Sequence, residues 1–201
     1  AAAVIELLVS DLKSPKNAGD ISELITHQVV VTQDPKVCRD ARALVVPGVG
    51  VFAACMDQLL SVGGAEIIAE RVAASRPIFG ICVGMQIFFD SSSEKIQKTG
   101  LGILPGNINE ITAPILPHMG WNTVSPAQDS KLFSGVENES FYFVHSYAAK
   151  DPVNGAANTI SNYGEDFLAA VEKDFIVATQ FHPEKSGAAG AKLISNWVES
   201  L

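Results

Sequence analysis

Short apolar runs rich in β-branched residues alternate with helix-like segments in the first half of the chain. These runs cover residues 4–8, 28–32, 43–47 and 78–81. Each has the length of a buried strand, and the stretch between the last two carries apolar residues at helical spacing. The alternation predicts a parallel sheet covered by helices.

The helical stretch 51–74 is interrupted at Gly63 and Gly64, so it predicts two short helices or one interrupted helix. In the second half the pattern changes, because strand-like runs follow one another with little helix-periodic sequence between them. These runs cover residues 107–111, 141–146, 167–171 and 175–181. A final helix is predicted around Leu193 and Trp197, with its apolar face on the sheet.

The predicted fold class is α/β, with a mostly parallel central sheet flanked by helices and an antiparallel-rich second half. The chain has 201 residues and a hydrophobic content of 47%, which suffices for one sizeable core. No repeat, low-complexity tract or linker divides it. We therefore expect a single domain over residues 1–201.

Charge and cysteine content narrow the possible partners. The chain has 14 Lys and Arg against 22 Asp and Glu, so nothing electrostatic favours binding to nucleic acid or to an anionic membrane. The spacing of the three cysteines fits neither a disulfide framework nor a zinc site, and no cofactor or metal is expected. With no secretory signal pattern and no apolar run of about 18 residues, we expect a cytoplasmic protein.

The most informative motif is Gly80-Ile81-Cys82-Val83-Gly84, where an apolar strand runs into a predicted helix over residues 83–89. It has the form of a nucleophile elbow with Cys in place of Ser. Such a turn lifts the sulfur out of the sheet, places it at a helix N-terminus that favours thiolate, and leaves the N–H of Val83 to bind an oxyanion. The alternative is a buried structural cysteine in a glycine-flanked turn, as we expect for Cys38 and Cys55.

A candidate base and its carboxylate partner lie near the far end of the chain. Pro183 disfavours helical dihedrals at His182, and in extended backbone residues two apart project to the same side. We therefore expect His182 to contact Glu184. A carboxylate bound to one ring nitrogen leaves the other nitrogen free to take a proton from a thiol.

A third motif, Pro47-Gly48-Val49-Gly50, is a glycine-rich loop after a predicted strand. Its backbone, at Val49 or Gly50, offers a second N–H to an oxyanion, and its glycines permit a peptide to reorient. An ordinary strand-ending turn is the alternative interpretation.

Together these three motifs resemble the class I glutamine amidotransferases, whose triad is a Cys on an elbow with His and Glu in a His-Pro-Glu run. From about Val29 to the C-terminus, two more stretches narrow the resemblance to the glutaminase subunits of imidazole glycerol phosphate synthases. These are Pro117-His118-Met119-Gly120-Trp121-Asn122 and Tyr142-Phe143-Val144-His145-Ser146-Tyr147.

The resemblance implies hydrolysis of glutamine to glutamate by Cys82, His182 and Glu184. It also implies a heterodimer with a (β/α)8-barrel cyclase subunit, which uses the ammonia to close an imidazole ring in histidine biosynthesis. By the same resemblance a set of residues lines the glutamine pocket: Gly50, Gln86, Tyr142, His145, Ser146 and Tyr147. The stretch Pro117 to Asn122 is expected to face the cyclase, with Trp121 near the ammonia exit.

The N-terminal segment departs from the family pattern. Where the family has a glycine-containing loop after its first strand, residues 6–17 contain no glycine and include Pro15. Two alternatives to the function stay open at this point. One is the glutaminase of another synthase, such as those making anthranilate, carbamoyl phosphate or guanylate, and the other is a non-catalytic binding subunit on the same fold.

Overall fold

The computed structural model describes residues 29–201, and the helices and strands below refer to this range. The helices are α1 (Pro35–Asp40), α2 (Phe52–Ser61), α3 (Gly64–Ala73), α4 (Val83–Gln86), the 3-10 turn η2 (Pro183–Lys185) and α5 (Gly187–Glu199). The strands are β1 (Leu44–Gly48), β2 (Ile78–Cys82), β3 (Ser91–Ser92), β4 (Lys98–Thr99), β5 (Asn107–Glu110), β6 (His118–Thr123), β7 (Ser140–His145), β8 (Tyr147–Ala149), β9 (Ala157–Tyr163), β10 (Glu165–Lys173) and β11 (Ile176–Thr179).

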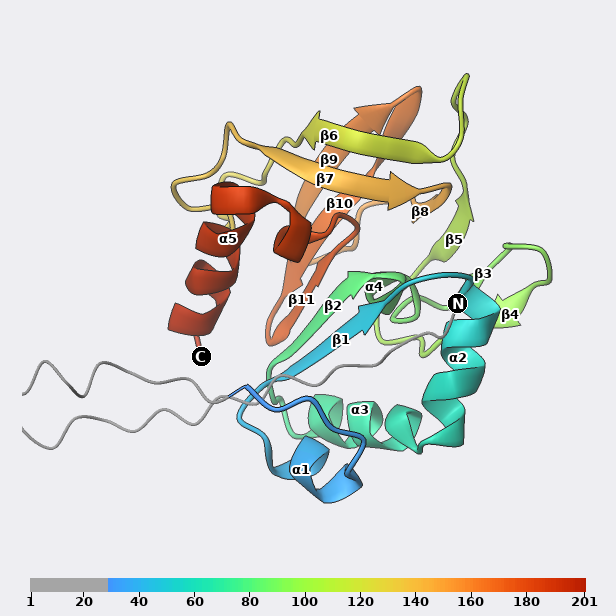
Figure 1. Ribbon diagram of the computed structural model, residues 1–201, viewed down its shortest axis with the longest axis vertical. Coiled ribbons are helices and arrows are strands. Elements are labelled where there is room, and N and C mark those ends of the chain that lie inside the picture. Colours follow the sequence, from blue (N-terminus) through green and yellow to red (C-terminus); the bar gives the residue numbers. More distant parts are fainter. Residues whose placement is uncertain (1–28) are drawn as a thin grey trace, which may run out of the picture.

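A five-stranded sheet in the order β1-β2-β11-β10-β9 forms the centre of the described fold (Figure 1). The pairs β1–β2 and β2–β11 are parallel, whereas β11–β10 and β10–β9 are antiparallel. The sheet is therefore evenly mixed in the described residues, where the sequence predicted a mostly parallel one. The reason is that β9, β10 and β11 follow one another as hairpins, turning through left-handed backbone at Gly164 and Asp174.

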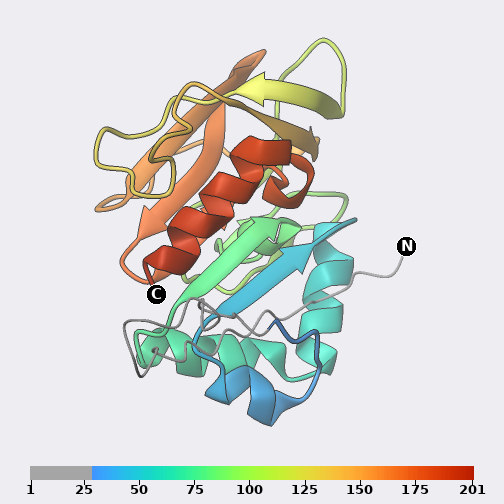
Figure 2. The same cartoon turned by 60° about the vertical axis from the view of Figure 1, so that its left-hand side comes forward.

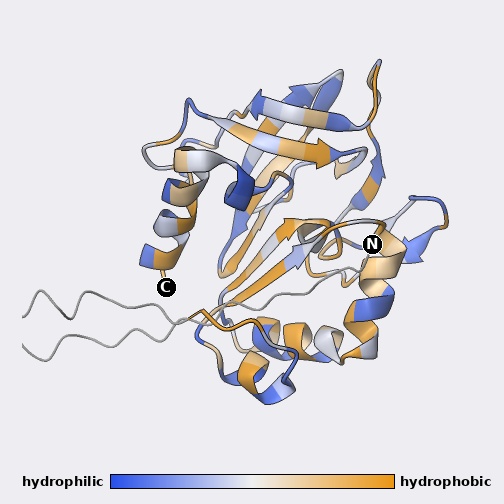
Figure 3. Cartoon of the chain, in the orientation of Figure 1, coloured by the Kyte–Doolittle hydropathy of each residue, from blue (hydrophilic) through white to orange (hydrophobic). Residues whose placement is uncertain are grey.

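Helices cover the parallel part of this sheet from two sides. Helices α1, α2 and α3 lie on one side of β1 and β2, and α5 lies on the other (Figures 1 and 2). Trp197 of α5 packs edge-on against Phe79 of β2, with ring centroids 5.1 Å apart. All five residues of β2 are buried, and Figure 3 shows β1 and β2 as mainly hydrophobic strands. Burial on both faces is why the sequence of these strands is a continuous apolar run.

Two smaller sheets complete the second half. Strands β4-β3-β5-β8 form one sheet, and β6 pairs with β7 in an antiparallel ribbon. The ribbon is joined to the central sheet by buried aromatic rings: Phe143 of β7 lies 5.7 Å from Phe167 of β10 and 5.5 Å from Phe181, measured between ring centroids. Packing of these rings fixes the position of β7 beside the end of β11.

Most of the strand and helix predictions in the described residues are confirmed. The confirmed elements are the runs that became β1, β2, β5, β7, β10 and β11, two separate helices over 51–74, and the final helix. The strand predicted at 28–32 is wrong where it is described, because residues 29–34 have no regular structure. The strand predicted at 4–8 lies outside the described residues, and the single domain over 1–201 stays a prediction.

The helix predicted over 83–89 is too long. Helix α4 ends at Gln86, and the next backbone bonds, from Phe88 to Met85 and from Phe89 to Gln86, have the tighter spacing of turns. The carbonyl of Phe88 then accepts bonds from Ile103 and Leu104. The helix does not continue because the carbonyls of residues 87–89 accept from residues 101–104 instead of from a next helical turn.

Among the described residues, no single helix is long and apolar enough to cross a membrane. The pair α2 and α3 reaches the necessary length and composition only when combined, and it is bent by 84°.

Glycines let α4 lie directly against the ends of β1 and β2. A Cβ on Gly84 would overlap the carbonyl oxygen of Val46, and a Cβ on Gly48 would come within 2.6 Å of the Gly84 nitrogen. Because both neighbours are backbone atoms, neither can move aside cheaply. The turn at Cys82 therefore depends on glycine at these positions.

Replacement of Gly84 by Ala should lower the free energy of unfolding by about 2–3 kcal/mol, because the new methyl group overpacks against β1. Gly135→Ala is the matched control: Gly135 has a φ of +79° but no heavy atom within 4 Å of an added Cβ, so it should cost only about 1 kcal/mol of backbone strain. Urea unfolding of both variants measures the difference. Equal losses would show that contact with β1 is not what requires glycine.

Candidate active site

Three parallel strands end at one edge of the central sheet. In the register of the sheet Gly48 pairs with Cys82, and Thr179 pairs with Ile81. The loop after β1, the elbow after β2 and the segment after β11 therefore meet at this edge. Ligand sites in open α/β sheets form at the carboxyl ends of parallel strands.

Cys82 occupies a strained turn between β2 and α4. Its φ of 54° and ψ of −114° are unusual for a residue with a side chain. The residue is buried, with 4% of its surface exposed, but its side chain lines a cavity. This is the elbow geometry that the glycine spacing predicted.

His182 and Glu184 contact each other as expected, although through a different local geometry. His182 is extended, with φ −101° and ψ 95°, but Glu184 lies in the 3-10 turn η2. The ring nitrogen Nδ1 of His182 lies 2.7 Å from the Glu184 carboxylate. The backbone of His182 is held by the carbonyl of Tyr142, to which its N–H donates at 2.9 Å.

The second ring nitrogen of His182 is left for the thiol. The atom Nε2 is buried and has no hydrogen-bond partner among the described residues. Burial by itself lowers the pKa of His182, but the nearby Cys82 sulfur and the Glu184 carboxylate favour the imidazolium and raise the pKa to about 9. Burial likewise opposes ionisation of Glu184, yet the bond and charge of His182 hold the pKa of this carboxyl below its usual value. The arrangement is an imidazolium between a sulfur and a carboxylate.

A cavity of about 420 Å³ opens beside this group. Its lining comprises Val49, Gly50, Cys82, Val83, Gln86, Glu94, Pro117, Val144, His145, Ser146, Tyr147, His182 and Lys185. The three predicted oxyanion residues are all in this lining. So are the predicted pocket residues, with the exception of Tyr142.

Tyr142 is a correction to the predicted pocket. It does not line the cavity, although Val144, two residues further along β7, does. Its ring lies near Trp121 of β6 instead. Its ring centroid lies 6.0 Å from that of Trp121. Glu94, Val144 and Lys185 line the cavity without having been singled out. Only Lys185 had a local sequence signal, its place directly after the His-Pro-Glu run.

The stretch Pro117 to Asn122 is only partly on the surface. Met119 and Trp121 are exposed by 62% and 58%, whereas His118 is 3% exposed, because successive side chains of β6 point to opposite faces. The side chain of His118 therefore cannot belong to an exposed interface in this structure. It stacks on Tyr163 instead, with ring centroids 4.0 Å apart.

A buried histidine pair lies under β6 and β7. His118 Nδ1 is 3.0 Å from His145 Nε2, and His145 Nδ1 is 3.1 Å from the carbonyl oxygen of Tyr147. Because a carbonyl can only accept, His145 carries its proton on Nδ1, and His118 must donate from its own Nδ1. Burial lowers the pKa of His118 to about 4 and that of His145 to about 3. Both rings are therefore neutral at pH 7.

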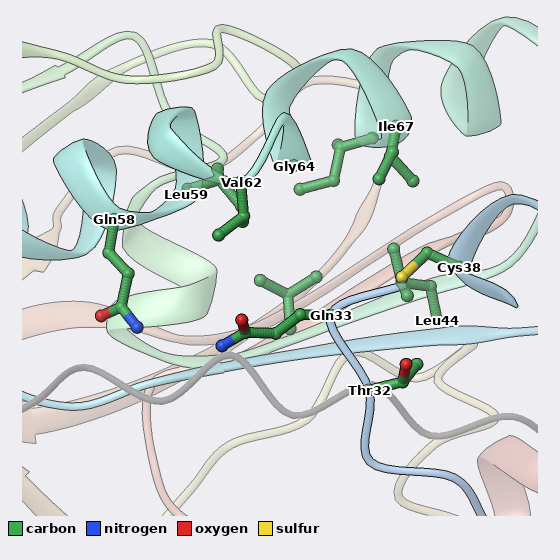
Figure 4. A pocket seen from close by; sticks show the side chains of 11 residues that line it. Thr32, Gln33, Cys38, Leu44, Gln58, Leu59, Val62, Gly64 and Ile67 are labelled. Atoms are coloured by element: carbon green, nitrogen blue, oxygen red, sulfur yellow. The ribbon is translucent and has the colours of Figure 1, made fainter. Parts of the chain in front are cut away.

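The other two cysteines have different surroundings. A small cavity of about 30 Å³ lies between β1, α2 and α3. Its lining, drawn in Figure 4, includes Cys38 together with mainly apolar side chains such as Leu44 and Ile67. The described residues that line this cavity include no histidine. Burial raises the pKa of the Cys38 thiol and raises that of Cys55 to about 11. Within residues 29–201, Cys82 is the cysteine that lies beside a histidine.

Comparison with known proteins agrees with this geometry. The family model described as "Glutamine amidotransferase class-I" matches residues 20–201. The chain belongs to this family. Relatives named "Imidazole glycerol phosphate synthase subunit HisH" from Mycobacterium bovis and Corynebacterium diphtheriae are 52% and 46% identical. The alignment covers 92% of both chains in the first case, and 99% of this chain and 98% of the relative in the second.

Solved structures share the class I amidotransferase fold. A structure titled "Crystal structure of glutamine amidotransferase" has a TM-score of 0.65 at 15% identity, covering 83% of this chain and 85% of that one. A putative GMP synthase protein from Thermoplasma acidophilum also has a TM-score of 0.65, at 20% identity, covering 98% and 93%. The resemblance predicted from the motifs is thus confirmed at the level of family and fold.

Replacement of Glu184 by Gln should lower the pKa of His182, because it removes the negative charge at Nδ1 while keeping a similar shape. Imidazole NMR titration should place wild-type His182 at a midpoint near 9 and the variant at lower pH. The buried pair His118 and His145 is the internal control, since its titration should not move. A wild-type midpoint near 6.5 would contradict the arrangement.

Proposed function

We propose that this chain hydrolyses glutamine to glutamate and supplies the ammonia to a cyclase subunit that forms imidazole glycerol phosphate in histidine biosynthesis. The observation that carries the proposal is the strained Cys82 turn beside His182, whose Nδ1 is held by Glu184. These three residues form the proposed Cys-His-Glu triad. The relatives that are 46–52% identical support this choice among amidotransferases, because they are named as subunits of imidazole glycerol phosphate synthase.

The proposed reaction uses the triad in two half-reactions. The Cys82 thiolate attacks the side-chain carbonyl carbon of glutamine, and the backbone N–H groups of Val83 and of the Val49–Gly50 loop stabilise the oxyanion. The His182 imidazolium donates its proton to the departing ammonia. Neutral His182 then takes a proton from water, which hydrolyses the glutamyl thioester and releases glutamate and the thiolate.

The polar groups of the cavity suit an amino acid with a carboxamide side chain. Among the described residues that line the cavity, Glu94 is the acidic one, and it also accepts from the N–H of Phe52 at 2.8 Å. We assign it to the α-ammonium group of glutamine. The remaining contacts come from Gly50, from the buried Gln86, and from the segment of His145, Ser146 and Tyr147.

The surface near β6 is assigned to the partner subunit. Met119 and Trp121 are large apolar side chains exposed on this strand, and Pro117 next to it lines the cavity. A (β/α)8-barrel cyclase docked here would cover apolar surface and receive ammonia from the adjacent cavity. The proposed assembly is a heterodimer, and its proposed location is the cytoplasm.

Replacement of Cys82 by Ala should abolish glutamine hydrolysis, because the elbow then lacks the nucleophile that lies beside the His182 base. The fold and the binding of the cyclase subunit should be nearly unchanged, since only the sulfur is removed. Ammonia release and partner binding are measured on the same preparation. Cys38→Ala is the control and should retain turnover, because Cys38 lines a separate cavity. Hydrolysis at the wild-type rate by Cys82→Ala would remove the central assignment.

The loop after β1 should make turnover depend on the partner. Val49 is 44% exposed, and its carbonyl is bound by the thiol of Cys55, at 3.5 Å from Sγ to oxygen. Val49, Gly50 and Pro117 line the same cavity, so a partner at β6 can displace the loop directly. Loss of one oxyanion donor typically costs about 10²–10³ in turnover, so a loop that presents its N–H only in the loaded complex would act as a gate.

The isolated chain should therefore hydrolyse glutamine slowly. Addition of the cyclase subunit with its nucleotide ligand bound should stimulate turnover by about 10²-fold or more. The control is the cyclase without ligand, which should stimulate less. Equal turnover in all three conditions would exclude the gate.

A further inference from the structure

Gln180 is a buried amide for which the proposed reaction has no use. It lies between β11 and His182, and none of its surface is exposed. Its neighbours in the chain, Thr179 and Phe181, are also fully buried. Burying a polar side chain costs free energy unless its donors and acceptors form hydrogen bonds. The hydrogen-bond partners of Gln180 therefore indicate its role.

The orientation of this amide follows from a backbone carbonyl. Gln86 Nε2 donates to the carbonyl oxygen of Tyr147 at 2.8 Å and to Oε1 of Gln180 at 2.9 Å. Because the Tyr147 carbonyl can only accept, Gln86 must present its nitrogen there, and Gln180 must present its oxygen to Gln86. The nitrogen of Gln180 is then directed at the Cys82 sulfur, 3.7 Å away.

The Tyr147 carbonyl is itself fixed from a second direction. It accepts from His145, which is bound to His118, and His118 Nε2 lies 3.3 Å from Nδ2 of Asn122. The Asn122 amide is oriented by two backbone groups, because Nδ2 donates to the carbonyl of Asn162 at 2.9 Å and Oδ1 accepts from the N–H of Thr123 at 2.9 Å. The donor and acceptor roles deduced from the Asn122 end of this row of hydrogen bonds agree with those deduced from the Tyr147 end. The anchor of the Gln86–Gln180 pair is therefore rigid.

Besides His182 and Gln180, few groups among the described residues are placed to stabilise the Cys82 thiolate. Helix α4 has only four residues, so the stabilisation expected from a helix N-terminus is small. Apart from the His182 imidazole and the Gln180 amide, the polar neighbour of the sulfur among the described residues is the carbonyl of Val144 at 4.0 Å, which accepts from a thiol and repels a thiolate. An amide N–H aimed at the sulfur favours the ionised form, which is the nucleophile.

We propose that Gln180 is a positioning residue, whose side-chain N–H donates to the Cys82 sulfur, favours the thiolate and aims it into the cavity. The amide cannot exchange its oxygen and nitrogen positions by rotating, because Gln86, which donates to the Tyr147 carbonyl, must also donate to the oxygen of Gln180. The inference deepens the proposed glutaminase function. Its main readout, the reactivity of the thiol, does not require that function.

The test compares Gln180→Met with the wild type and with Thr179→Val. Methionine has a similar length but no donor. Thr179→Val removes a buried hydrogen bond to the Phe181 carbonyl, on either side of Gln180 in the chain, without touching the sulfur. It is therefore the matched control for a general loss of packing in this segment. Alkylation of Cys82 by iodoacetamide is followed from pH 5 to 10 by mass spectrometry of the Cys82 peptide.

In Gln180→Met the midpoint of alkylation should move up by about one pH unit, with an about tenfold lower rate on the acid side of the midpoint. In Thr179→Val the midpoint should stay in place. Gln180→Asn, which keeps the amide but withdraws it by one methylene, should give a smaller upward shift and serves as the second variant if the Met protein does not fold. In glutamine hydrolysis, the Met substitution should lower kcat and leave KM nearly unchanged.

An unchanged midpoint in the Met variant, or in the Asn variant if the Met protein is unfolded, would overturn the proposal. So would equal shifts in Gln180→Met and Thr179→Val. The proposed function has its own test. If the wild type in complex with the loaded cyclase releases no ammonia from glutamine, the glutaminase assignment is wrong. The alkylation midpoints would still decide the role of Gln180 in that case.

Discussion

The register of three parallel strands is the constraint on which the rest of this structure depends. Pairing of Gly48 with Cys82 places the glycine loop beside the sulfur, and pairing of Thr179 with Ile81 brings His182 to the same edge. A shift of one residue in either pair would turn every side chain of that strand to the opposite face. Residues that are about a hundred positions apart in the chain meet because backbone hydrogen bonds fix this register.

Around the sulfur, the buried polar side chains bind one another, and Nε2 of His182 is the ring atom left for the thiol. The imidazole of His182 binds a carboxylate, the Gln86 and Gln180 amides bind each other, and their polarity is set by the Tyr147 carbonyl. In a buried site such bonds are strong, and each unmatched group is costly. The chain of bonds therefore holds the sulfur and its base in one arrangement before any substrate enters.

The parts of the fold that follow from local pattern were predictable from the sequence. Strands β1 and β2 are continuous apolar runs, and the elbow at Cys82 is marked by glycines two residues before and after it. Strand β6 was missed because exposed positions alternate along it and Gly120 interrupts it. Gln180 gave no signal, because its partners lie 94 and 98 residues away in the chain. The register that joins them exists only in the folded protein.

Reactivity of the three cysteines toward a glutamine analogue with an electrophilic side chain tests the central claim most directly. The chain, in complex with the ligand-loaded cyclase, is treated with the analogue and mapped by mass spectrometry. We predict one adduct per chain, on Cys82, which excess glutamine prevents. An adduct confined to Cys38 or Cys55, or no adduct while iodoacetamide still alkylates Cys82, would contradict it.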